Sequence, residues 1–245
     1  MNRFAALVMA AGRSTRFADP NYKKPMAQLD GRAVWLHSVE RFTSREDVCQ
    51  TIVVVAPEDR EEFQRKFGAN LAFMNVELCE GGAERADSVR AGLAKVSDEA
   101  THVAVHDAAR PLVTEKEIDA VFEAAVEHHA AILASPITAT LKRVEDGRIT
   151  ATESREGLWA AQTPQVFELG LLRRAHQEGA DTPATDDAQL VERLGEPVVI
   201  VEGSAENLKI TTRDDLRLAA AILAARPEKK PTRGTNPFAN EDLWR

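Results

Sequence analysis

The sequence predicts an α/β fold in which a mostly parallel sheet is covered by helices on both faces. Short apolar runs rich in Val, Ile and Ala alternate along the chain with longer segments of helical periodicity. Strands that are buried on both faces have such continuous apolar runs, and parallel strands need helical crossovers between them. The predicted strands span residues 4–9, 51–56, 75–79, 102–106, 131–135 and 198–202.

Helical segments fill the intervals between these strands. Thr114 and Glu117 have the spacing of a capping box, and Thr212, followed by Asp214 and Asp215, opens the last helix. The predicted helices span residues 33–43, 57–67, 84–96, 114–129, 168–178, 186–194 and 212–225.

One stretch interrupts this alternation. Residues 138–152 alternate in polarity around Asp146 and Gly147, which is a strong signal for a β-hairpin with a tight turn. A two-stranded hairpin is only marginally stable by itself, so it must pack on something else. A second subunit is one candidate, and we expect a protruding arm over about residues 138–158.

Length and composition set the class of protein. The 245 residues are 44% hydrophobic and 29% charged, as in an ordinary soluble globular protein. A net charge of −8 without a long basic run argues against a nucleic-acid-binding face. The first apolar run is about half as long as a membrane span, so we interpret it as a strand and expect no membrane partner.

The cysteines and the C-terminal residues give predictions about redox state, location and domain boundaries. Cys49 and Cys79 lie in no CxxC pattern and near no His at ligand spacing, which favours reduced thiols and a cytoplasmic location. Residues 1–225 are predicted to form a single domain. Residues 226–245 contain several Pro, Lys and Gly residues and are predicted to be a linker-like tail.

Positive charge gathers after the first predicted strand. The apolar run ends in Ala10-Ala11-Gly12, and Arg13, Arg16, Lys23 and Lys24 follow closely. A small-residue turn after a strand exposes backbone N–H groups to a phosphate, although an ordinary βα turn has the same composition. The turn contains neither GxGxxG nor a P-loop, so neither common nucleotide fingerprint is present.

A glycine pair follows the third predicted strand. Gly81 and Gly82 permit close backbone approach to a planar base. Arg85 follows them, and Ser88 lies one turn into the next predicted helix. The alternative, a glycine turn that caps this helix, accounts for the glycines but not for Arg85 and Ser88.

Two more segments place charged residues beside predicted strands. Asp107 follows an apolar strand, where ligands of open parallel sheets bind, and its carboxylate suits a ribose hydroxyl or Mg²⁺. Alternatively, Asp107 caps a turn and pairs with Arg110. Lys209 lies within a short strand pattern before the last helix, and it needs an anion if it faces inward but none on an edge strand.

Together with Leu158-Trp159-Ala160-Ala161-Gln162-Thr163-Pro164-Gln165, these segments resemble the family of 2-C-methyl-D-erythritol 4-phosphate cytidylyltransferases over about residues 4–225. His-Asp-Ala-Ala-Arg-Pro at 106–111 and Gly-Gly-Ala-Glu-Arg-Ala-Asp-Ser-Val at 81–89 are the specific motifs. The resemblance implies a Rossmann-like domain, a homodimer through the hairpin arm, and transfer of CMP from CTP with release of pyrophosphate in non-mevalonate isoprenoid synthesis. It also implies Mg²⁺ or another divalent cation, held mainly on the CTP phosphates, with Asp107 as a candidate ligand.

The resemblance also implies roles for individual residues. The catalytic group is Arg16, Lys24, Asp107 and Lys209. The CTP-binding residues are Ala10, Ala11, Gly12, Arg13, Ser14, Gly82, Arg85, Ser88, Asp107 and Ala108. The residues on the acceptor side are Arg110, Thr140, Arg155, Thr163 and Lys209, with Thr140 and Arg155 expected to reach across from the partner's arm.

The chemistry implied needs no protein base, because a phosphomonoester is already anionic near neutral pH. Fixed positive charges would instead stabilise the charge that builds on the phosphates. The chain departs from the family pattern at Ser14, Ala83, Ala139 and the Lys-Pro-Met sequence at 24–26. Two alternatives therefore stay open: a ribitol 5-phosphate cytidylyltransferase, and a nucleotide-binding module without turnover.

Overall fold

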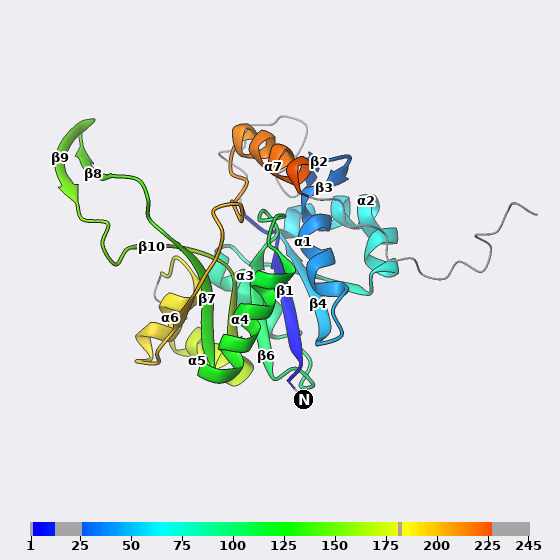
Figure 1. The fold of residues 1–245 in the computed structure, drawn as a ribbon. Coiled ribbons are helices and arrows are strands. Elements are labelled where there is room, and N and C mark those ends of the chain that lie inside the picture. The colour runs from blue at the N-terminus through cyan, green and yellow to red at the C-terminus, as the bar shows by residue number, and fades with distance from the viewer. Residues whose placement is uncertain (1, 13–25, 181–182, 227–245) are drawn as a thin grey trace, which may run out of the picture.

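The predicted mostly parallel sheet is present in the computed structural model, which describes residues 2–12, 26–180 and 183–226 (Figure 1). Within these residues, the sheet has the strand order β11-β7-β10-β6-β1-β4-β5. All neighbouring strands run parallel except β10, which is antiparallel to both β6 and β7. The strands are β1 (Phe4–Met9), β4 (Val48–Val55), β5 (Val76–Glu80), β6 (His102–Asp107), β7 (Ala130–Pro136), β10 (Trp159–Glu168) and β11 (Val199–Glu202).

Helices cover both faces of the sheet, as predicted. Along β1, Phe4 and Val8 face one core and Ala5 and Leu7 face the other, because successive side chains of a strand point to opposite faces. All four side chains are buried. The first core includes side chains of α1 (Val34–Thr43), α2 (Arg60–Phe73) and α4 (Glu115–His128), and the second includes those of α3 (Arg85–Leu93), α5 (Leu169–Glu178) and α6 (Asp187–Arg193).

Strand β10 is absent from the sequence-based prediction, which is wrong at this point. Its centre contains Gln162, Thr163, Pro164 and Gln165, so no continuous apolar run marks it. These polar side chains are nevertheless buried, because they bond to segments that are distant in sequence. Gln162 Nε2, for example, donates to Ser204 O at 3.0 Å.

The predicted hairpin is confirmed. Strands β8 (Leu141–Glu145) and β9 (Arg148–Glu153) pair with each other in a separate antiparallel sheet that stands away from the body (Figure 1). Asp146 and Gly147 in the turn have φ angles of 49° and 76°, the left-handed region that this turn type requires. Val144 and Ile149 are 54% and 65% exposed, so the arm lacks a core of its own.

A third, smaller core joins the last helix to the body. α7 (Arg213–Ala225) packs near the short strands β2 (Gln28–Leu29) and β3 (Arg32–Ala33), with Leu29, Ile210 and Ala219 buried between them. The two predicted capping boxes, at Thr114 and Thr212, are both present. Pro57–Asp59 forms the short 3₁₀ helix η2 that leads into α2.

Other predictions concern the ends of the chain and the cysteines. Of the predicted tail at 226–245, residues 227–245 lie outside the described residues, so the proposed domain boundary stays a prediction. Cys49 and Cys79 are both free thiols. None of the helices in the described ranges combines the length and apolar character needed to cross a membrane.

Candidate active site

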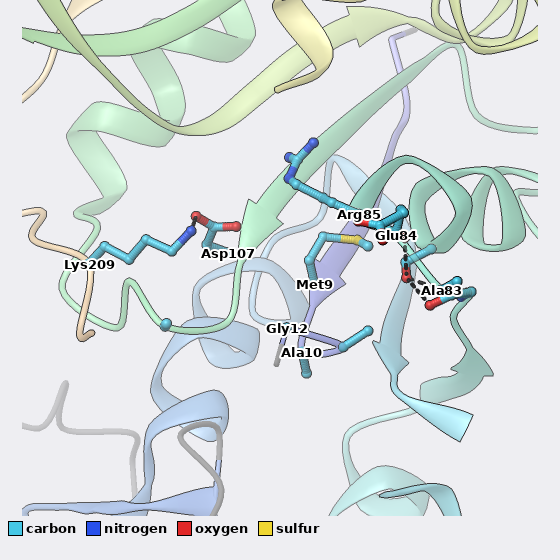
Figure 2. A pocket seen from close by; sticks show the side chains of 12 residues that line it. Met9, Ala10, Gly12, Ala83, Glu84, Arg85, Asp107 and Lys209 are labelled. Atoms are coloured by element: carbon cyan, nitrogen blue, oxygen red, sulfur yellow. Dashed lines mark hydrogen bonds and ion pairs between the residues drawn. The ribbon is translucent and has the colours of Figure 1, made fainter. Parts of the chain in front are cut away.

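A pocket lies at the carboxyl ends of β1, β5 and β6 (Figure 2). The described residues enclose about 290 Å³, near the lower end of the usual range for small-molecule sites. Met9 and Asp107 are register partners on β1 and β6, and Ala108 N–H donates to Met9 O at 3.0 Å. The sheet therefore brings the turn after β1 directly beside Asp107, at the edge where ligands of such sheets bind.

The turn after β1 forms one wall. Ala10, Ala11 and Gly12 line the pocket, and Ala10 N–H donates to Val54 O at 2.7 Å. Ala108, predicted to contact CTP, is fully buried and does not line the pocket, whereas the adjacent Ala109 does. The predicted phosphate-binding residues Arg13, Ser14, Arg16 and Lys24 lie outside the described residues.

The glycine segment before α3 forms a second wall, next to the turn after β1. Gly82 N–H donates to Ser88 Oγ at 3.1 Å, so the Ser88 hydroxyl closes the turn back onto α3. A Cβ at Gly81 would lie 2.5 Å from Ser88 Oγ, and a Cβ at Gly82 would overlap Asp87 Cβ. The glycines thus allow the turn to approach its own helix closely, and Ser88 is 2% exposed within that contact.

Arg85 brings a positive charge to this wall. It belongs to the first turn of α3 and lines the pocket, and its side chain is 30% exposed. Its Nη2 donates to Asp187 Oδ2 at 2.6 Å, across 102 residues of sequence. Burial lowers the pKa of Arg85, but the Asp187 carboxylate outweighs that effect and raises the pKa above its ordinary value.

Asp107 and Lys209 form an ion pair at the far end of the pocket. Lys209 Nζ lies 2.7 Å from Asp107 Oδ2, and Figure 2 shows it reaching Asp107 from the side opposite Arg85. Burial would raise the pKa of Asp107, but Lys209, with Arg85 and Arg110, lowers it to about 2. Asp107 is therefore ionised near neutral pH, and Lys209, whose side chain is 40% exposed, pairs with it without being buried.

The Thr163 side chain on β10 holds the backbone of Asp107. Asp107 N–H donates to Thr163 Oγ1 at 2.9 Å, and the same oxygen lies 3.2 Å from His106 Nδ1. His106 Nε2 lies 3.1 Å from Arg110 O. These contacts fit one set of protons, in which the Thr163 hydroxyl donates to Nδ1 and Nε2–H donates to the carbonyl. His106 is fully buried, and burial lowers its pKa to about 4, so it is neutral near pH 7.

Arg110 holds the segment that carries Lys209. Its Nη1 donates to Asn207 O at 2.6 Å, and its Nε lies 3.8 Å from Asp107 Oδ2. The alternative in which Arg110 pairs with Asp107 is thus present in part, and Arg110 does not line the pocket. The short strand predicted around Lys209 is wrong: Ile210 N–H makes a single bond to Ala109 O, and the segment is irregular.

The remaining acceptor-side residues lie apart from this pocket within the single chain. Thr140 and Arg155 are exposed and belong to the protruding arm, and Arg155 donates to Thr138 O. Thr163 is 5% exposed beneath Asp107 and lines no part of the pocket.

Several residues of this site have no signal in the sequence. Met9, Glu84 and Ala109 line the pocket because they adjoin residues with recognisable chemistry. Asp187 pairs with Arg85 only through the fold. Across the described ranges, no group of three or more His, Cys, Asp or Glu side chains is arranged to hold a metal ion.

Comparisons with known proteins agree with this geometry. The family model described as 2-C-methyl-D-erythritol 4-phosphate cytidylyltransferase matches residues 4–225. Enzymes of that name from Rhodopirellula baltica and Bacillus velezensis are 42% and 43% identical; the matches cover 89% and 91% of this chain and 94% and 96% of theirs. The crystal structure of the Thermus thermophilus enzyme is 33% identical, with a TM-score of 0.74, over 91% of this chain and all (100%) of that chain. The chain therefore belongs to the 2-C-methyl-D-erythritol 4-phosphate cytidylyltransferase family, which transfers a cytidylyl group from CTP to that phosphate in isoprenoid biosynthesis.

Proposed function

We propose that the pocket between the turn after β1, the start of α3 and Asp107 is where CTP reacts with 2-C-methyl-D-erythritol 4-phosphate. The observation that carries this proposal is the Asp107–Lys209 ion pair in a pocket whose wall includes the small residues Ala10, Ala11, Gly12 and Gly82. Ala10, Ala11 and Gly12 leave room for the triphosphate, and Gly82, Arg85 and Ser88 form the side facing the base and ribose.

The reaction is a direct displacement. An oxygen of the acceptor phosphate forms a bond to the α-phosphorus of CTP as the α–β phosphoanhydride bond breaks, and pyrophosphate leaves with the electron pair. The acceptor is already anionic near neutral pH, so no side chain has to remove a proton. His106 is buried and neutral, which fits a structural group that holds its neighbours and does not act as a base.

Catalysis then depends on positioning and on fixed positive charge. Two anionic reactants repel each other, and cations held in place before the reaction offset that repulsion in the transition state. Lys209 supplies one such charge, and Asp107 keeps its ammonium at the pocket. In this proposal the other fixed positive charges come from Arg16 and Lys24, and Arg13 and Ser14 also bind the triphosphate. These four residues lie outside the described part of the chain.

Asp107 is a side chain at the pocket that suits a divalent cation. Mg²⁺ in nucleotide enzymes is commonly held by one or two carboxylates together with substrate phosphates and water. Asp107 is ionised and borders the pocket, so it would be the protein ligand of an ion carried mainly by the CTP phosphates. Bound there, Mg²⁺ would neutralise part of the triphosphate charge.

The acceptor site requires a second subunit in this proposal. Arg110, Thr163 and Lys209 surround Asp107, whereas Thr140 and Arg155 belong to an arm with exposed Val144 and Ile149. A partner's arm that lies over the pocket would bury these apolar side chains and bring its Thr140 and Arg155 to the acceptor. We therefore propose a homodimer.

Steady-state kinetics with pyrophosphate release as the readout test the proposal. Lys209→Met, Arg16→Ala and Lys24→Ala should each lower kcat by ~10²-fold or more, as removal of a transition-state donor does. Lys116→Met, on the exposed surface of α4, is the matched control and should keep wild-type turnover. Wild-type turnover in Lys209→Met, or equal use of ribitol 5-phosphate by the wild type, would contradict the assignment.

A further inference from the structure

A chain of three side chains, in which His176 and Asp187 are buried and Arg85 is half-buried, leads from α5 and α6 to the pocket. Asp187, at the start of α6, is 0% exposed and uses both carboxylate oxygens. Its Oδ2 accepts from Arg85 Nη2 at 2.6 Å, and its Oδ1 lies 2.9 Å from His176 Nε2. His176, on α5, is 2% exposed and touches no part of the pocket.

The protons in this chain can be assigned from its charges. Burial raises the pKa of Asp187, but Arg85 and the hydrogen bond from His176 bring it below its ordinary value. An ionised carboxylate only accepts, so His176 Nε2 carries the proton that it donates to Oδ1. Among the described residues, His176 Nδ1 has no hydrogen-bond partner, so the contact with Asp187 is the polar interaction that fixes the ring.

The backbone beneath the carboxylate is held independently. The N–H groups of Asp187 and Ala188 both donate to Gln165 Oε1, at 3.1 and 3.2 Å. Gln165 Nε2 donates to Asp186 Oδ2 at 2.8 Å. Because β10 fixes the start of α6 in this way, the remaining freedom of Asp187 is rotation of its side chain, and His176 restrains that rotation.

We propose that His176 is a positioning residue, which acts through Asp187 to hold the Arg85 guanidinium at the nucleotide side of the pocket. The inference rests on the proposed function, in which Arg85 faces CTP. An Arg side chain loses rotamer entropy when it is ordered, and a fixed carboxylate orders Arg85 before the nucleotide binds.

The consequence is specific to binding. Arg85 lies on the base and ribose side in this proposal, away from the reacting phosphorus, so it contributes equally to the ground state and the transition state. Loss of such a contact raises KM and leaves kcat unchanged. His176→Leu, which keeps a similar volume but has no donor, should therefore raise the KM and Kd for CTP about tenfold with kcat nearly unchanged.

A double-mutant cycle separates positioning from general stability. His176→Leu is made in the wild type and in Arg85→Ala, and CTP binding to each purified protein is measured by calorimetry alongside turnover. If His176 acts through Arg85, His176→Leu has no further effect on CTP affinity once Arg85 is absent. His176→Gln, whose amide can donate where Nε2 does, should restore most of the affinity. His128→Leu, at an exposed histidine on α4, is the control.

The outcomes are distinguishable. An equal loss of CTP affinity in both Arg85 backgrounds, or wild-type affinity in His176→Leu, would overturn the inference. If His176→Leu does not fold, Asp187→Asn, which keeps the shape but loses the charge, takes its place in the same cycle. A wild type that binds CTP without turnover would overturn the proposed function alone, because the affinities still test His176. A wild type without CTP binding would overturn both.

Discussion

Thr163→Val tests whether the hydroxyl beneath Asp107 organises the site. Thr163 Oγ1 accepts from Asp107 N–H at 2.9 Å and lies 3.2 Å from His106 Nδ1, inside a region where Thr163 is 5% exposed. Valine has the same shape but neither donates nor accepts, so a buried main-chain N–H and a buried ring nitrogen both lose their partner.

The magnitude follows from these two contacts. A buried polar group left without a partner costs ~1–3 kcal/mol, so two together cost about 3 kcal/mol. The added methyl group offsets roughly 1 kcal/mol by its burial. The net destabilisation is therefore about 2 kcal/mol, which lowers the Tm of a domain of this size by ~4–8 °C. Loosening of Asp107 should also lower kcat/KM, by about tenfold.

Calorimetric melting and pyrophosphate-release kinetics measure the two effects on the same preparation. Thr150→Val on the exposed arm strand β9 is the control, and its stability should stay within ~0.5 kcal/mol of the wild type. A Thr163→Val protein that melts within a degree of the wild type and turns over normally would refute the role given to this hydroxyl.

Four further predictions concern acid stability, two glycines and the arm. Burial holds the pKa of His106 at about 4, below its ordinary 6.5, so the unfolded chain takes up the proton first as pH falls. The stability contributed by this neutral histidine is thus fully present above about pH 6.5, and the free energy of unfolding falls by about 3 kcal/mol between pH 6.5 and pH 4. Urea unfolding at both pH values should show a smaller loss of stability for His106→Gln than for the wild type. Identical losses in the two proteins would contradict the reasoning. Gly12→Ala should leave unfolding unchanged, because no described atom lies within 4 Å of the new Cβ, but weaken CTP binding in calorimetry. Gly82→Ala, whose Cβ would overlap Asp87, should lower stability by ~1–3 kcal/mol, and an unchanged urea midpoint would count against the close turn. Ile149→Glu should convert the proposed dimer to a monomer in sedimentation analysis, whereas an unchanged mass would place the interface elsewhere.

Local patterns were sufficient for most of the fold. The six predicted strands and the hairpin are present, and the predicted helices appear within three residues of their observed bounds, except that α2 continues to Phe73, beyond its predicted end at residue 67. The agreement follows because burial on one or two faces imposes a period that a sequence displays. The Asp146-Gly147 turn was predictable for the same reason, since few residues other than Gly, Asn and Asp adopt its backbone angles.

Strand β10 shows where local patterns fail. Its Gln162, Thr163 and Gln165 are polar yet buried, because their partners come from the segment after β11, from β6 and from α6 respectively. Lys209 is the converse case: apolar neighbours suggested a strand, but isolated bonds on either side of it, from Arg110 Nη1 to Asn207 O and from Ile210 N–H to Ala109 O, replace a strand ladder. Long-range polar contacts decided both, and no local period records them.

The sequence by itself determined the α/β architecture, the carboxylate and glycines at strand ends, and the family to which the chain belongs. The tertiary structure alone decided that Lys209 pairs with Asp107, that Thr163 supports Asp107 from β10, and that Asp187 fixes Arg85. The physical reason is that neighbouring residues display the period of burial, whereas a hydrogen bond between residues 102 positions apart exists only once the sheet and the helices packed on it have been assembled.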